Sequence, residues 1–92
     1  MKANYIVCYD IRDERRLARV YRCLKELGLH LQYSVFHCRL TWPELNELKE
    51  KLAEIIDDER DDVRIYPMPA AMEVTVLGCG DRAPEGIDLF LA

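Results

Sequence analysis

The chain has 92 residues, half of them apolar, and a formal net charge of −4. This length predicts a single small domain, for which oligomerisation is a natural way to bury more apolar surface. The acidic balance excludes attraction of nucleic acid through bulk charge. We find no twenty-residue apolar span, signal peptide or lipidation motif, and therefore expect a cytoplasmic protein without membrane association.

The charge is unevenly distributed along the chain. Segment 12–25 carries six basic and two acidic residues, a local charge of +4, whereas segment 44–62 carries nine acidic and three basic residues, a local charge of −6. Such asymmetry suggests two surfaces with different partners. Two solvated helix faces would give the same pattern, so charge alone does not choose between these interpretations.

The first strand is predicted over residues 4–10, which are apolar at nearly every position. Both faces of this strand should therefore be buried. A helix should follow over residues 13–28, where leucine, valine and tyrosine recur at helical spacing. Asp13 suits the N-terminal cap and Gly28 the C-terminal stop.

The next segment, "LHLQYSVFHCRL" over residues 29–40, is rich in β-branched and aromatic residues. It predicts either one long strand or two short strands bent near Tyr33 and Ser34, because no Gly or Pro marks a turn. The second helix begins more clearly. Thr41 and Glu44 form a capping box, and an apolar stripe continues to residue 56.

Two further strands are predicted over residues 63–68 and 73–77, the first with Pro67 in a position that suits a sheet edge. A Gly- and Pro-containing loop over 79–86 leads to an apolar strand at 87–91. Two helices among four or more strands predict an α+β sandwich with helices on one face of the sheet. We expect a second copy of the chain to cover the other face, with the apolar tail reaching across to it.

Asp10 is the first acidic residue and stands at the end of the first strand. Taken alone it suits a turn. It also suits a Mg²⁺ or Mn²⁺ ligand, because magnesium sites often use only one or two carboxylates together with waters and substrate phosphates. A dimer would supply a second carboxylate if Asp10 lay near the two-fold axis.

Several other side chains are candidates for chemistry. Arginine donates two parallel hydrogen bonds to a phosphate, which makes four arginines candidate phosphate contacts: Arg12, Arg15, Arg16 and Arg39. Ser34 lacks a nucleophile-elbow motif, so we expect a structural hydrogen bond or an active-site contact. His30 and His37 could transfer protons near neutral pH, although nothing in the sequence positions them. The four cysteines are too scattered for a zinc site and suit reduced, packed thiols.

Three motifs resemble a known family: "YIVCYDI", then "QYSVFHCRL", then "VRIYPM", in the family's order and spacing from about Tyr5 to Leu77. The chain is similar to the CRISPR-associated endonuclease family Cas2. The resemblance implies a ferredoxin-like βαββαβ domain over residues 1–78 that forms a homodimer through its sheet. Residues 79–92 would be a loop and an additional C-terminal strand reaching toward the partner protomer.

The resemblance further implies metal-dependent hydrolysis of RNA or of double-stranded DNA, with Mg²⁺ or Mn²⁺. The family's metal-binding aspartate matches Asp10, and its S-V-F motif places Ser34 and Phe36 at the catalytic site. The basic residues after the aspartate match Arg12, Arg15 and Arg16 more loosely. His37 departs from the acidic residue often found there in the family.

The resemblance also implies a role as the central dimer of the spacer-acquisition complex, bridging dimers of the Cas1 integrase in antiviral defence. Three alternatives remain on the same fold: a purely architectural DNA-binding adaptor, a toxin-type RNA interferase and a ligand-sensing regulator. The regulator would leave Asp10 as a turn residue, and the arginines after Asp10 argue against it.

Overall fold

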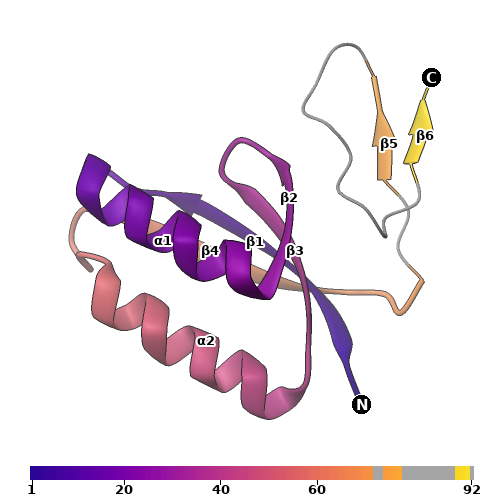
Figure 1. Ribbon diagram of the computed structural model, residues 1–92, viewed down its shortest axis with the longest axis horizontal. Helices are drawn as coiled ribbons and strands as arrows, with labels where there is room; N and C mark the ends of the chain where they lie inside the picture. Colours follow the sequence, from indigo (N-terminus) through magenta and orange to yellow (C-terminus); the bar gives the residue numbers. More distant parts are fainter. Residues whose placement is uncertain (72–73, 78–88, 92) are drawn as a thin grey trace.

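The computed structural model describes residues 1–71, 74–77 and 89–91. These residues form two helices and six strands (Figure 1). Their bounds are β1 Ala3–Asp10, α1 Glu14–Leu27, β2 Gly28–Gln32, β3 Val35–Leu40, α2 Trp42–Ile55, β4 Asp62–Met68, β5 Val74–Val76 and β6 Leu89–Leu91.

The first four strands form one sheet in the order β2-β3-β1-β4, and every neighbouring pair is antiparallel. Both helices pack on the same face of this sheet (Figure 1). The order β1-α1-β2-β3-α2-β4 with these pairings is the ferredoxin-like βαββαβ arrangement. The predicted fold class, an α+β sandwich with helices on one face, is confirmed.

The strand β1 contributes to both faces of the sheet, because successive side chains of a strand point to opposite sides. Val7 and Tyr9 are buried in the core with the helices, where they meet Phe36 from β3 and Leu24 from α1. Ile6 and Cys8 alternate with them, so they face the other side, and both are half-buried.

Caps fix the helix ends where the sequence predicted them. Asp13 accepts a hydrogen bond from the backbone N–H of Arg16 at 3.0 Å, which caps α1. In α2 the Glu44 carboxylate accepts from the Thr41 N–H at 2.8 Å, and the Thr41 hydroxyl accepts from the Glu44 N–H at 3.3 Å. Both bonds of the predicted capping box are thus present.

The ambiguous segment 29–40 forms two strands, β2 and β3, joined by a turn at Tyr33 and Ser34. Ser34 has a φ of 63°, a left-handed conformation that is uncommon for a residue other than glycine. The strand β2 begins directly at Gly28, which is extended and ends α1 without an intervening loop.

The C-terminal strands lie apart from the main sheet. β5 pairs with β6 in parallel, with Val74 opposite Leu89 and Val76 opposite Leu91. The apolar tail at 87–91 was expected to lack a partner within the chain, which is wrong for residues 89–91; residues 87 and 88 lie outside the described residues. β5 was expected within the ferredoxin-like domain, but it does not belong to the four-stranded sheet. The domain boundary at residue 78 and the contact of the tail with a partner protomer both stay predictions.

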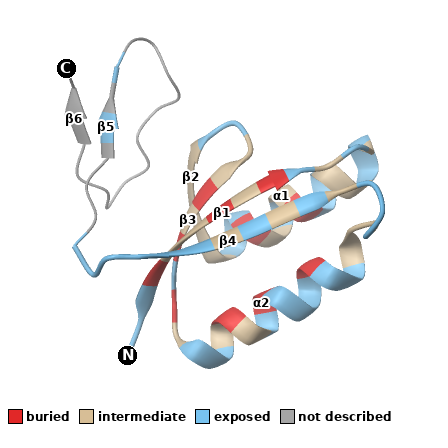
Figure 2. Ribbon diagram, turned by 180° about the vertical axis from the view of Figure 1, so that it is seen from behind, coloured by how far each residue is buried: buried red, intermediate tan, exposed pale blue. Residues whose placement is uncertain are grey.

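The face of the sheet opposite the helices carries no further element among residues 1–71, 74–77 and 89–91 (Figure 2). β4 is an edge strand, as Pro67 predicted, and its Tyr66 and Met68 are exposed there. In the described part of the chain, neither helix has the length and apolar character needed to cross a membrane.

Replacing Gly28 with alanine should destabilise the fold by about 1–3 kcal/mol, the usual cost of overpacking. A Cβ atom at this position would lie 2.5 Å from the Cys38 Sγ and 2.6 Å from the His37 carbonyl oxygen. Urea unfolding measures the change. Ala53→Ser adds one atom at an exposed position of α2 and should change stability by less than about 0.5 kcal/mol. Equal stability of Gly28→Ala and wild type would contradict this packing.

Candidate active site

Asp10 is the last residue of β1, and its side chain is exposed. It faces the side of the sheet away from the helices, because Tyr9 before it is buried in the core. Its carboxylate lies 3.6 Å from a guanidinium nitrogen of Arg12. The backbone N–H of Tyr9 donates to the Ser34 carbonyl oxygen at 3.1 Å, so the β2–β3 turn lies beside this strand end.

A second carboxylate faces Asp10. Asp62, the first residue of β4, is its direct partner in the antiparallel β1–β4 ladder. Side chains of directly opposed residues point to the same side, with Cβ atoms roughly 4.5–5.5 Å apart. Asp62 is itself paired with Arg64 at 3.0 Å. No local sequence pattern predicts this neighbour, because the register between distant strands depends on tertiary contacts.

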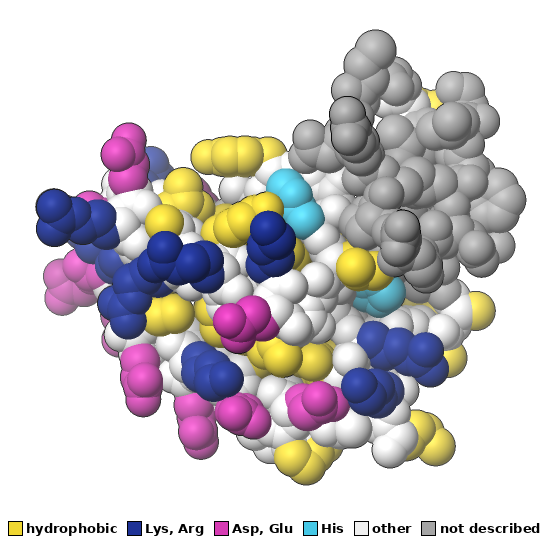
Figure 3. All heavy atoms as spheres, in the orientation of Figure 1, with side chains coloured by type: hydrophobic (Ala, Val, Ile, Leu, Met, Phe, Trp, Pro, Cys, Tyr) yellow, Lys and Arg dark blue, Asp and Glu magenta, His cyan; other side chains and the backbone are white. Residues whose placement is uncertain are grey.

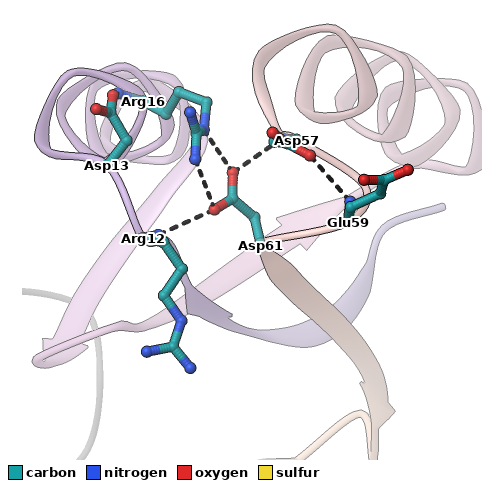
Figure 4. A network of polar contacts seen from close by, with 6 residues as sticks. All are labelled: Arg12, Asp13, Arg16, Asp57, Glu59 and Asp61. Atoms are coloured by element: carbon teal, nitrogen blue, oxygen red, sulfur yellow. Dashed lines mark hydrogen bonds and ion pairs between the residues drawn. The ribbon is translucent and has the colours of Figure 1, made fainter.

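Asp61 points to the opposite side of the sheet and ties three segments together (Figure 4). It accepts hydrogen bonds from the backbone N–H groups of Arg12 and Asp57, both at 2.9 Å. It also accepts from the Arg16 guanidinium, from Nε at 2.7 Å and from Nη2 at 3.2 Å. One carboxylate thus joins the start of α1 to the loop before β4.

These donors all favour the ionised form of Asp61. The Arg16 hydrogen bond, followed by the backbone donors of Arg12 and Asp57, holds the pKa of the Asp61 carboxyl well below its usual range. The same bond raises the pKa of the Arg16 guanidinium. The Asp61 side chain is fully covered and the Arg16 side chain is 22 % exposed, so this ion pair is part of the fold.

The predicted phosphate contacts therefore differ in their availability. Arg16 is held by Asp61 on the helix side, whereas Arg12 and Arg15 are exposed at the start of α1. Arg39 is exposed at the far end of the sheet, where it pairs with Asn4. Asn4 and Asp10 are six residues apart on β1, which is about 20 Å at a strand rise of 3.3 Å per residue. The structure brings Arg12 to Asp10 but leaves Arg39 distant.

The two other predicted site residues lie in different environments. Ser34 is half-buried in the turn beside the end of β1. Phe36 is completely buried and packs among Tyr9, Tyr21 and His30, with ring centroids 4.9–6.2 Å from its own. From this position Phe36 holds neighbouring side chains in place and does not reach the surface.

His37 lies away from Asp10, next to Asn4, whose side-chain oxygen is 3.0 Å from its Nε2 atom. Burial, and to a smaller extent the charge of Arg39, lower the pKa of His37. A neutral imidazole at neutral pH is therefore favoured here. This position does not support a proton-transfer role for His37 at the Asp10 end of the sheet.

The donor set at Asp10 fits a hard divalent cation. Asp10 and Asp62 offer carboxylate oxygens, the ligands that Mg²⁺ and Mn²⁺ prefer. Two facing carboxylates repel each other, and a cation between or beside them would relieve this repulsion. Among the described residues no three His, Cys, Asp or Glu side chains converge on one point, so one chain would supply at most two such ligands here.

Fold and site together define a small ferredoxin-like protein with carboxylates and arginines at one end of its sheet. The model of the family CRISPR associated protein Cas2 matches residues 3–75. The chain is 54% identical to CRISPR-associated endoribonuclease Cas2 2 of Thermodesulfovibrio yellowstonii, over 98% of this chain and 99% of that relative. The chain therefore belongs to the Cas2 family.

Solved structures agree with this assignment. The crystal structure of Streptococcus pyogenes Cas2 at pH 6.5 aligns with a TM-score of 0.68 and 32% identity, over 72% of this chain and 86% of that one. A chain of a partial Cas6-RT-Cas1–Cas2 complex aligns with a TM-score of 0.65 and 29% identity, over 75% and 80% of the two chains. The resemblance seen in the sequence motifs is confirmed.

Asp61→Asn should lower the free energy of unfolding at neutral pH, because the amide cannot pair with Arg16 as a charge. An unfolded aspartate titrates near pH 3.9. Since the folded pKa of Asp61 is depressed, its contribution is fully present above about pH 4 and declines as the pH falls below that value. Denaturant unfolding from pH 7 to pH 2.5 should therefore show the wild type and Asp61→Asn converging in acid.

Asp58→Asn is the matched control, because Asp58 is an exposed neighbour in the same loop. It should follow the wild type at every pH. A constant difference between wild type and Asp61→Asn down to pH 2.5 would contradict the charge assigned to Asp61.

Proposed function

We propose that the protein is a metal-dependent endonuclease whose active site forms at the Asp10 end of the sheet. The observation that carries this proposal is the geometry at that end, where Asp10 faces Asp62 and lies 3.6 Å from the Arg12 guanidinium. Carboxylates that hold a cation and an arginine that contacts a phosphate are components of metal-dependent phosphodiester hydrolysis. The relative in Thermodesulfovibrio yellowstonii named an endoribonuclease supports this reading.

Asp10 would hold the cation, with Asp62 as the adjacent carboxylate. When bound, Mg²⁺ or Mn²⁺ would polarise the scissile phosphate and lower the pKa of a coordinated water. The side chain of Arg12 is free to turn toward a phosphate, because its pair with Asp10 is exposed to solvent. Ser34 lies at the turn beside this end and would contact the substrate or order a water there.

A homodimer would bring two such ends together. The face of the sheet that bears Asp10 exposes Tyr66 and Met68 and leaves Ile6 and Cys8 only half-buried. Apolar side chains on an uncovered sheet face are typical of an interface. Pairing of two chains through this face would place both Asp10 carboxylates at the interface, and a two-fold axis beside Asp10 would let them share one cation.

The second candidate role is architectural. A Cas2-like chain occurs in the partial Cas6-RT-Cas1–Cas2 complex to which this chain is similar. A dimer of this chain would then bridge Cas1 integrase dimers during spacer acquisition, with exposed arginines against the DNA backbone. This role does not need a cation at Asp10, so the two roles separate experimentally. RNA and double-stranded DNA are both proposed substrates, and a toxin-type RNA interferase would share the same metal chemistry.

Asp10→Asn should reduce cleavage of labelled RNA and duplex DNA by at least about a hundredfold, because the amide keeps the shape but loses the charge that attracts the cation. Cleavage by the wild type should require Mg²⁺ or Mn²⁺ and stop in chelator. Sedimentation should show an unchanged assembly state. Undiminished cutting by Asp10→Asn would place the activity elsewhere and leave Asp10 as a turn residue.

Arg15→Gln should flatten the dependence of nucleic-acid affinity on salt. Each phosphate contact contributes about 0.9 to the slope of log affinity against log salt for duplex DNA and about 0.7 for a single strand. Arg15 is exposed on α1, so its loss should leave stability unchanged. Arg60→Gln, an exposed arginine in the α2–β4 loop, is the control. If Arg15→Gln and Arg60→Gln give the same slope as wild type, Arg15 makes no phosphate contact.

A further inference from the structure

A cavity of about 340 Å³ lies between α1 and the β2–β3 hairpin, on the helix-bearing side of the sheet. Four aromatic rings line it: Tyr9, Tyr21, His30 and Tyr33. Its volume is at the lower end of the roughly 300–1,000 Å³ range of small-ligand sites. The space therefore suits one planar group rather than a large ligand.

The rings of this aromatic cavity are held in defined orientations. Tyr21 and His30 meet edge to face, with centroids 5.5 Å apart, and His30 lies 4.9 Å from Phe36. Phe36 is completely buried and packs against both rings from the core. A preformed set of rings loses little conformational entropy when a flat ligand enters.

Tyr33 differs from the other three rings because it is 77 % exposed. It stands in the turn next to Ser34, whose left-handed conformation fixes the direction of the chain there. A tyrosine presented in this way offers a free π-face at the mouth of the aromatic cavity. The ring contributes little to the core of this chain and is accessible to a ligand.

Basic side chains lie beside the aromatic cavity. Arg22 lines the rim, and Arg15 and Arg19 continue from it along α1 at spacings of three and four residues. Side chains at these spacings are neighbours on a helix surface, with Cβ atoms about 5–6 Å apart. Among the described residues, no ion pair engages these three arginines. Basic side chains gather over α1 beside hydrophobic ones on this face (Figure 3).

Aromatic faces beside a row of arginines match a nucleotide unit, in which a flat base adjoins a charged phosphate. A base paired inside a duplex cannot enter such a cavity, because its faces are covered by stacking, whereas the bases of a single strand are free. Glu14, also at the rim, is an acceptor that suits the amino group of cytosine or adenine.

We propose that this aromatic cavity binds one unstacked base of a single-stranded nucleic acid, with its phosphates on Arg15, Arg19 and Arg22. The inference rests on the proposed function, since it takes nucleic acid as the substrate. The proposed base site is distinct from the site at Asp10. Tyr9 lines the cavity on the helix side of the sheet, whereas the next residue, Asp10, faces the other side. The site predicts a preference for single-stranded over duplex substrate.

The test measures binding of a single-stranded oligonucleotide that carries one 2-aminopurine, in chelator so that no cleavage occurs. Stacking in the cavity should quench the 2-aminopurine fluorescence. Tyr33→Ser should weaken binding about five- to 150-fold, the range that corresponds to one base stacked on an aromatic side chain. Trp42→Ser removes another exposed aromatic, 66 % exposed at the start of α2, and should bind like wild type. Both positions are exposed, so both variants should fold.

Two further ligands sharpen the result. A fully abasic oligonucleotide of the same length keeps the phosphates and lacks every base. It should therefore bind with equal affinity to the wild type and to Tyr33→Ser. Adenosine monophosphate should compete at least tenfold more weakly than the oligonucleotide, because it carries only one phosphate for the three arginines.

Three results would overturn the inference: equal binding by Tyr33→Ser and Trp42→Ser, no effect of removing the bases, or equal competition by adenosine monophosphate. A peptide that binds through Tyr33 while the oligonucleotide does not would reassign the cavity to a protein partner and overturn it as well. If any of these results occurs while Asp10→Asn abolishes cleavage, the proposal of a base-binding cavity is wrong and the proposed nuclease activity is retained. If base binding is seen but Asp10→Asn cuts normally, the nuclease assignment fails alone.

Discussion

The antiparallel pairing of β1 with β4 determines which side chains meet at the Asp10 end of the sheet. Its last rung sets Asp10 opposite Asp62. Because side chains alternate across a strand, the preceding residue, Asp61, is then directed to the helix side, where it holds Arg16 and the backbone of Arg12 and Asp57. The β1–β4 register therefore places the carboxylates of Asp10 and Asp62 together on one face of the sheet. It also places Asp61 on the other face, where it binds the start of α1.

The same alternation separates two surfaces at the end of β1. Asp10 belongs to the face that the helices leave uncovered, where apolar side chains suit a second copy of the chain. Tyr9 belongs to the helix side, where aromatic rings and the arginines of α1 lie together. Metal chemistry and base recognition would then occupy opposite sides of one strand end, only one residue apart in the sequence.

Local features of the fold were predictable because their causes are local. The capping box of Thr41 and Glu44, the Asp13 cap and the edge position indicated by Pro67 all follow from neighbouring residues. The residues alone left the split of 29–40 into two strands open, because it depends on Ser34 adopting a positive φ without a glycine; only the family resemblance implied two strands there. The pairing of β6 with β5 also escaped prediction, since strand partners are chosen by tertiary contacts.

The candidate site was predictable only in part for the same reason. Asp10 and Arg12 stand close in the sequence and lie close in the structure. Arg16 has the same local signature as Arg15, yet Asp61, 45 residues away, engages it. Phe36 matches a family motif but is buried, and Asp62 and the aromatic cavity arise from residues that only the folded sheet brings together.

A metal site at the Asp10 end of the sheet can be tested by Mn²⁺ binding, followed by calorimetry and by the loss of the free-ion paramagnetic resonance signal. We expect the wild type to bind one ion for every two chains, and both Asp10→Asn and Asp62→Asn to bind Mn²⁺ at least tenfold more weakly. Asp58→Asn should bind as the wild type does. Equal Mn²⁺ affinity and stoichiometry in Asp10→Asn and wild type would contradict a metal site at this end of the sheet.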